Sequence, residues 1–179
     1  DEIDRRKKEP RWPLEQLKIP EAWALWRAKH NGALPGAGIL VGHPDTGFSD
    51  HQQVAHRLQK PGRSFLRDAD GNEEPDARDT LQSADAGFLQ APGHGTSTAS
   101  VIVSGDRDET VAGATEVHGV APGARILPLR VSRSVVHFDF ENVGRAILHA
   151  VEQGADVISM SLGGPGLSSF VRACIARAH

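Results

Sequence analysis

The chain has 179 residues, the size of one globular domain, and 39% of them are hydrophobic. Its 20 Lys and Arg residues nearly balance 23 Asp and Glu residues, and the resulting net charge of −3 gives no reason to expect nucleic acid or a membrane as a partner. The one cysteine, Cys174, excludes a disulfide within the chain, and its apolar neighbours favour a packed helix face. Any ligand must therefore be recognised by a local group of residues.

The first part of the chain predicts an arm followed by a short helix. Residues 1–13 are charged and interrupted by proline, which favours a flexible, solvated arm. From Pro20 to just before Asn31, apolar residues that include Trp23 and Trp26 recur at helical spacing. We expect an amphipathic helix there, whose task is core packing.

A strand and a long surface segment come next. The apolar run at 38–42 suits a buried strand of a parallel sheet, and we expect Pro44 to end that strand because proline lacks the backbone donor. Asp45 then lies at the mouth of the sheet. Residues from about 56 to 92 have little apolar periodicity and many Asp, Glu, Gly and Pro residues, which predicts a surface insertion.

The remaining elements predict an alternation of helices and strands. A helix should start around His94 and stop at Gly105, and a strand should cover 125–131. Asp139 is a suitable N-cap for the next helix, and 155–160 is typical of another buried strand. The fold class is therefore α/β, a parallel sheet with helices on its faces and a right-handed crossover. Ligands of such sheets bind beyond the carboxyl ends of the strands.

Two short sequence motifs, expected at the carboxyl edge of the sheet, carry groups suited to proton transfer. Imidazole titrates near neutral pH, so His94 could take the proton of a serine hydroxyl, which is a poor nucleophile without a base. A carboxylate such as Asp45 could hold the ring in the required tautomer. Taken singly, however, Asp45-Thr46-Gly47 is typical of a turn, and His94-Gly95-Thr96 of a capped or solvated histidine.

Four blocks of the sequence together resemble the subtilisin-like serine peptidases, the subtilase family or peptidase family S8. The blocks are 38–47, 93–100, 119–131 and 154–165, in the order that the family shows. The resemblance implies a subtilisin-like sheet with helices on both faces, with Asp45 as the orienting carboxylate and His94 as the base. It also implies that 14–179 is the amino-terminal part of a catalytic domain.

The same resemblance implies that two catalytic groups lie after His179. No block of the family's nucleophile type, Gly-Thr-Ser, is present, and neither is the Asn block that supplies an oxyanion donor. We therefore expect the fold to be incomplete in this chain, and the chain alone to be inactive. The serines that are present lack the nucleophile's sequence setting: Ser97, Ser100, Ser161, Ser168 and Ser169.

By resemblance, two segments should hold an extended peptide substrate. Residues Ser161, Leu162, Gly163 and Gly164 would line the pocket before the scissile bond, although a plain Gly-Gly-Pro turn is the alternative. The second edge would include Val136 and Phe138, where many subtilases have glycines, so the groove should be narrower or this edge covered. Phe140 and Val143 would either wall an apolar pocket or belong to the core.

Two positions depart from the subtilase pattern, and one acidic run bears on whether the chain binds a metal ion. His43 stands where subtilases have an aliphatic residue, and the sequence leaves open whether it competes for the Asp45 carboxylate. Gln53 stands where an acidic calcium ligand often occurs, which argues against calcium there. The acidic run at 68–76 favours a solvated loop over a metal site. We assign no metal-ligating residue and expect no cofactor to be required for the chemistry, and the sequence leaves open a structural calcium that Gln53 does not support.

Two functions follow from these observations. The first is a serine endopeptidase of the subtilisin type with a polypeptide substrate; the second is a catalytically dead segment that binds a peptide or a partner protein. An incomplete sheet would expose an unpaired edge, so we expect a carboxyl-terminal fragment or a second copy to complete the core. By family, an extracytoplasmic or secreted location is expected.

Overall fold

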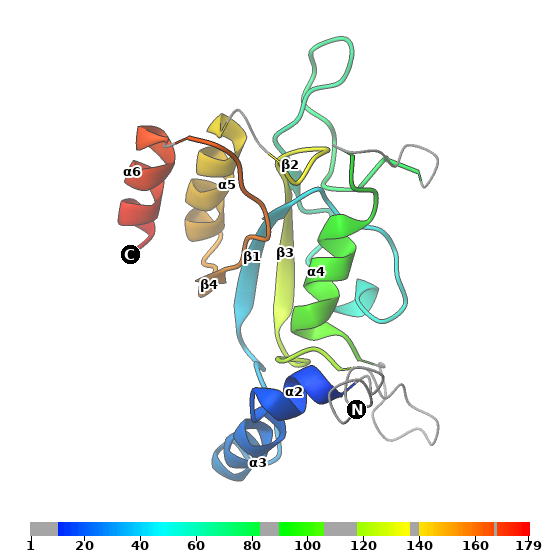
Figure 1. Cartoon of the computed structure of the whole chain (residues 1–179), viewed down its shortest axis with the longest axis vertical. Helices are drawn as coiled ribbons and strands as arrows, with labels where there is room; N and C mark the ends of the chain where they lie inside the picture. The colour runs from blue at the N-terminus through cyan, green and yellow to red at the C-terminus, as the bar shows by residue number, and fades with distance from the viewer. Residues whose placement is uncertain (1–10, 83–89, 106–117, 137–139, 167) are drawn as a thin grey trace, which may run out of the picture.

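A four-stranded parallel sheet organises the computed structural model, which describes residues 11–82, 90–105, 118–136, 140–166 and 168–179. The strand order is β2-β3-β1-β4, and every pairing is parallel (Figure 1). Non-consecutive strands are neighbours, as expected for strands joined by crossover connections. The strands are β1 (Leu40–Asp45), β2 (Arg63–Ser64), β3 (Arg125–Arg130) and β4 (Val157–Ile158).

The helices confirm most of the predicted ones. They are α2 (Trp12–Gln16), α3 (Ile19–Lys29), the 3-10 turn η1 (Ala55–Arg57), α4 (His94–Val103), α5 (Glu141–Glu152) and α6 (Ser169–Ala178). The predicted arm lies outside the described residues up to residue 10, and its described end is already helical because α2 begins at Trp12. The predicted cap Asp139 also lies outside the described residues, and Phe140 occupies the N-cap position.

The prediction that Pro44 ends its strand is wrong, since β1 continues to Asp45 and Pro44 pairs with Leu129 in register. The reason lies in the direction of the backbone groups. The carbonyl of Gly42 faces β4 and accepts from Ser159, whereas the carbonyl of Asp45 faces β3. The missing donor of Pro44 therefore points to the β4 side, where pairing ends at Gly42, so no ladder hydrogen bond is lost.

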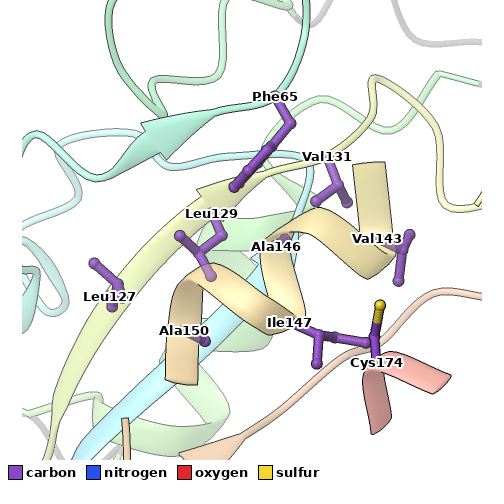
Figure 2. Close-up of a cluster of buried hydrophobic side chains, with 9 residues drawn as sticks. All are labelled: Phe65, Leu127, Leu129, Val131, Val143, Ala146, Ile147, Ala150 and Cys174. Carbon is purple, nitrogen blue, oxygen red and sulfur yellow. The ribbon is translucent and has the colours of Figure 1, made fainter. Parts of the chain in front are cut away.

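Helices cover both faces of the sheet, and successive residues of β3 enter two separate cores. Leu127 and Leu129 point toward α5, and Ile126 points the other way, toward α4. Figure 1 shows α5 and α4 on opposite sides of β1 and β3. Figure 2 shows the first core, in which Cys174 of α6 closes the outer side of α5. Cys174 is thus a buried packing residue, as the sequence predicts.

The segment 56–92 is more than a surface insertion. Its strand β2 joins the sheet beside β3, and Phe65 and Ala77 are buried. Sequence periodicity missed this strand because two residues are too short a span to show alternation. Within the described ranges, no helix combines the length and the apolar character that a bilayer span needs.

Candidate active site

Asp45 is the last residue of β1, and its side chain is only 1% exposed at the carboxyl edge of the sheet. A buried carboxylate needs donors, and the structure supplies them from nearby. The backbone N–H of Thr46 donates to Oδ1 at 2.7 Å, and the Thr98 hydroxyl donates to Oδ2 at 3.1 Å. Asp45 is therefore held as an acceptor whose two oxygens have separate partners.

His94 is the first residue of α4, and its ring completes the contacts of Oδ1. Nδ1 of His94 lies 2.7 Å from Oδ1 of Asp45. Because an ionised carboxylate only accepts, Nδ1 carries the hydrogen, and Nε2 is left as the basic nitrogen. The His94 side chain is 28% exposed, so one side of the pair is buried and the other meets solvent. This arrangement can take a proton from a group placed at Nε2.

Two glycines allow close backbone packing around the turn that follows β1. A Cβ on Gly95 would lie 2.1 Å from the carbonyl oxygen of Gly47 and 3.2 Å from Oδ1 of Asp45. Gly47 itself has φ of 110°, and a Cβ there would meet the carbonyl oxygen of Ala77 at 2.5 Å. The N–H of Gly95 then donates to the Thr46 hydroxyl at 3.1 Å. The short distance between Asp45 and His94 thus depends on the missing side chain of Gly95, and the missing side chain of Gly47 lets the chain at Ala77 pack against the same turn.

An arginine network anchors the turn that precedes His94. Arg130, fully buried at the end of β3, donates to Glu74 at 2.9 Å and lies 3.8 Å from Asp79. Burial lowers the pKa of Arg130, and the carboxylates of Glu74 and Asp79 oppose that effect. Asp79 in turn accepts from the N–H of Gly93 at 2.8 Å. The 56–92 segment therefore helps to fix where α4 begins.

Two further titratable groups have shifted pKa values. Hydrogen bonds from Lys60 and Arg78 lower the pKa of Asp50, and Asp50 raises the pKa of Arg78 in return. These groups are about half exposed, so the pairs contribute little to stability. Burial lowers the pKa of His149 on α5, and Arg63 acts in the same direction. None of these groups contacts the Asp45–His94 pair.

Sequence reasoning left His43 undecided and missed Thr98 at this site. His43 is 3% exposed, and its Nε2 lies 3.8 Å from Oδ2 of Asp45 and 3.0 Å from the Thr98 hydroxyl. Simple spacing could have found both residues. Positions 43 and 45 share one face of a strand, and positions 94 and 98 share one face of a helix.

The two predicted substrate edges pair with each other. Val136 and Gly163 form a parallel bridge, and the N–H of Gly163 donates to the carbonyl of Val135 at 3.1 Å. Ser161 and Gly164 are exposed, Leu162 is half-buried against the α5 core, and Phe138 lies outside the described residues. Val143 and Phe140 also belong to that core, which favours the packing alternative for them.

Two of the serines considered as nucleophiles, Ser168 and Ser100, contribute to helix geometry rather than to the Asp45–His94 pair. Ser168 caps α6 by accepting from the N–H of Val171 at 3.2 Å, and the Ser100 hydroxyl donates to the carbonyl of Ser97 at 2.6 Å. Among the residues that the structure describes, no serine hydroxyl contacts the His94 ring. A nucleophile is therefore not part of the described site.

The positions considered for cations are engaged by other groups. The amide oxygen of Gln53 accepts from the Ser104 hydroxyl at 3.0 Å. In the 68–76 loop, Glu73 pairs with Arg145 and Glu74 with Arg133. Within the described part of the chain, no three His, Cys, Asp or Glu side chains gather in a group that could hold a metal ion.

The parallel α/β sheet thus carries a buried Asp–His pair at its carboxyl edge, where the ligands of such sheets bind. Residues 36–178 match the model of the subtilase family, so this chain belongs to that family. It is 31% identical over 153 residues to an intracellular serine protease of Paenibacillus polymyxa, and 31% identical over 154 residues to the major intracellular serine protease of Bacillus subtilis.

The solved structures agree with the family and its fold. A protease from Pseudoalteromonas arctica matches with a TM-score of 0.64 and 25% identity over 81% of this chain and 47% of its own. The matches with the two intracellular proteases cover 85% of this chain but 39% and 40% of those relatives. The chain thus spans about two fifths of the length of these two curated relatives.

Proposed function

We propose that Asp45 and His94 are two members of an Asp-His-Ser triad in a subtilisin-type serine endopeptidase, whose serine lies outside these 179 residues. The observation that carries the proposal is the 2.7 Å contact between Nδ1 of His94 and the buried Oδ1 of Asp45. Family membership and the names of the relatives as serine proteases support it. The catalytically dead, peptide-binding alternative is not better supported.

In the proposed reaction, Nε2 of His94 accepts the proton of the serine hydroxyl as that oxygen attacks the peptide carbonyl. Nε2 later returns the proton to the leaving amine. Asp45 keeps Nδ1 protonated throughout and stabilises the imidazolium that forms. Its burial strengthens this interaction because water does not screen it. The chain needs no cofactor for these steps.

The proposed substrate is an extended polypeptide that lies along Ser161, Leu162, Gly163 and Gly164 on one side, and along Val136 and Phe138 on the other. The bridge between Val136 and Gly163 bears directly on this proposal. A peptide strand placed between the two edges needs the hydrogen bond from Gly163 to Val135 to open. The net cost of opening one such bond is about 1 kcal/mol, which peptide contacts can offset.

A partner polypeptide is proposed to cover the free side of β4, as either a carboxyl-terminal fragment or a second copy. Among the described strands, β4 pairs with β1 alone, and Val157 remains 51% exposed on it. Beside β4 lies a hollow of about 330 Å³ whose lining includes Val151, Met160 and Ile175. An open strand next to apolar surface favours association with another chain.

Sedimentation velocity on the purified chain checks the proposed association. We expect a species heavier than the 19.2 kDa monomer at micromolar concentration, because the apolar hollow and the β4 edge would be covered together. Val157→Lys should shift the distribution to the monomer, whereas Val101→Lys, at an exposed site on α4, should leave it unchanged. A monomer that unfolds cooperatively at all concentrations contradicts the proposal.

A peptidase assay on two forms of the protein tests the proposed function. The complete product of the gene that encodes this sequence should cleave an unstructured protein such as casein, and phenylmethylsulfonyl fluoride should block the cleavage. The 179-residue chain should show no such activity, because it lacks the nucleophile of the proposed triad. A folded complete product that binds peptides without cleaving them would favour the dead, peptide-binding alternative.

The expected extracytoplasmic location stays a prediction. The names of the two relatives that are 31% identical place those proteins inside the cell, so family membership does not fix the compartment of this chain. Cys174 is free and buried, which suits either compartment.

A further inference from the structure

Asp45 lies between two histidines rather than beside one. Its Oδ1 accepts from His94 and from the N–H of Thr46, at 2.7 Å in each case. Its Oδ2 faces the Thr98 hydroxyl at 3.1 Å and Nε2 of His43 at 3.8 Å. The second oxygen therefore has its own set of contacts, and the proposed function uses only the first.

His43 is locked in place by groups from three elements. It precedes Asp45 by two residues in β1, so the two side chains share one face of the strand. Nδ1 lies 3.0 Å from the carbonyl oxygen of Ser159, which follows β4. Nε2 lies 3.2 Å from the carbonyl oxygen of Gly95 and 3.0 Å from the Thr98 hydroxyl, both on α4. Among the groups that contact His43, Asp45 is the one that carries an ionisable side chain.

The contacts of His43 favour a hydrogen on each of its ring nitrogens. A carbonyl oxygen only accepts, and each ring nitrogen of His43 faces one, so both nitrogens need a hydrogen. The Thr98 hydroxyl then accepts from Nε2. Its single hydrogen has three acceptors within reach, Oδ2 of Asp45 at 3.1 Å and the carbonyl oxygens of His94 and Gly95 at 3.1 and 3.2 Å, and we assign it to Oδ2 because that oxygen carries charge. A neutral ring with its hydrogen on Nδ1 would compete with Oδ2 of Asp45 for the Thr98 hydrogen. Either Nε2 of His43 or Oδ2 of Asp45 would then lose that donor inside the protein, which is costly.

We propose that His43 is a positioning residue for Asp45: a buried imidazolium that holds the second carboxylate oxygen through the Thr98 hydroxyl while His94 occupies the first. Asp45 compensates the buried charge of His43, as a buried ion requires. The inference rests on the proposed function only for the role of Asp45 in catalysis. The hydrogens on His43 and Thr98 are placed from the contacts described above. It gives the carboxylate one fixed orientation, in which Oδ1 faces His94.

Nitrogen-15 NMR of the histidine rings tests the inference in the 179-residue chain. In long-range ¹H–¹⁵N spectra at pH 7, both ring nitrogens of His43 should give the signals of protonated nitrogens. Asp45→Asn removes the compensating charge, so His43 should become neutral and keep the hydrogen on Nδ1. A wild-type His43 with one bare nitrogen at pH 7 overturns the inference, and so does a His43 that keeps both hydrogens in Asp45→Asn.

Two helix variants test the part played by the hydroxyl. Thr98→Val removes the hydroxyl with little change of shape, and should shift both the Nε2 proton signal of His43 and the Nδ1 proton signal of His94. Ser100→Ala removes a hydroxyl from the same helix that donates to a neighbouring carbonyl instead, and should leave both signals in place. If His43 and His94 gave identical signals in wild type and in Thr98→Val, the Thr98 hydroxyl would not link His43 to Oδ2 of Asp45, and the inference would be overturned.

The spectra require no peptide hydrolysis, so the two proposals can fail separately. A doubly protonated His43 in a protein whose complete gene product cleaves nothing supports this inference and removes the proposed function. An active gene product whose His43 is neutral keeps the proposed function and removes this inference.

Discussion

His94→Ala in the complete gene product is expected to lower kcat about 10⁶-fold, with KM nearly unchanged. The variant removes the group that is proposed to take the proton of the nucleophile, and in subtilisin the loss of the triad histidine costs about 2 × 10⁶-fold in kcat. Substrate contacts lie elsewhere, so binding should persist. Steady-state kinetics on a chromogenic peptide measure both constants. His51→Ala, which changes an exposed histidine outside the site, is the matched control and should retain wild-type kcat.

Asp45→Asn belongs to the same prediction and should lower kcat about 10⁴-fold. The amide keeps the size of the carboxylate but loses its charge, and its NH₂ group favours the wrong tautomer of His94. Asp50→Asn neutralises an exposed carboxylate five residues away and should have no comparable effect. If Asp45→Asn and Asp50→Asn gave equal kcat values, Asp45 would not orient the base.

Gly95→Ala is expected to destabilise the fold by more than about 3 kcal/mol. The new methyl group would lie 2.1 Å from the carbonyl oxygen of Gly47, which is backbone and cannot rotate away. Relief requires α4 to move from β1, and that movement breaks the contact between His94 and Asp45. Urea unfolding followed by circular dichroism measures the change in the free energy of unfolding.

Ser97→Ala is the control for this helix variant, since Ser97 is exposed two residues along the same helix. Its free energy of unfolding should stay within about 0.5 kcal/mol of wild type. Equal stabilities of Gly95→Ala and Ser97→Ala would show that β1 and α4 do not pack as closely as described.

Patterns that extend over many residues made the core of this fold predictable. The apolar spacing of α5, the run before Asp45 and the stretch 125–131 each gave the correct type of element, because burial on one or both faces fixes their composition. The position of Asp45 beside His94 followed from the sheet edge together with the family's order of motifs. No single motif would have placed them together.

Features that depend on neighbours distant in sequence were not predictable. The short strand β2 is stabilised by pairing with β3, and Pro44 is tolerated because β4 ends beside it. The bridge from Val136 to Gly163 joins two loops that no local pattern connects. His43 was recognised as unusual, but its contact with Thr98 depends on how α4 docks on β1.

Mass spectrometry of the complete gene product after treatment with a fluorophosphonate tests the central claim most directly. The account predicts one covalent adduct on a single serine in the folded wild-type protein. His94→Ala, folded and treated for the same time, should gain no adduct, because its serine lacks the base that Asp45 holds in place. Equal labelling of the two proteins, or no labelling of folded wild type, would contradict the claim that this pair activates a serine.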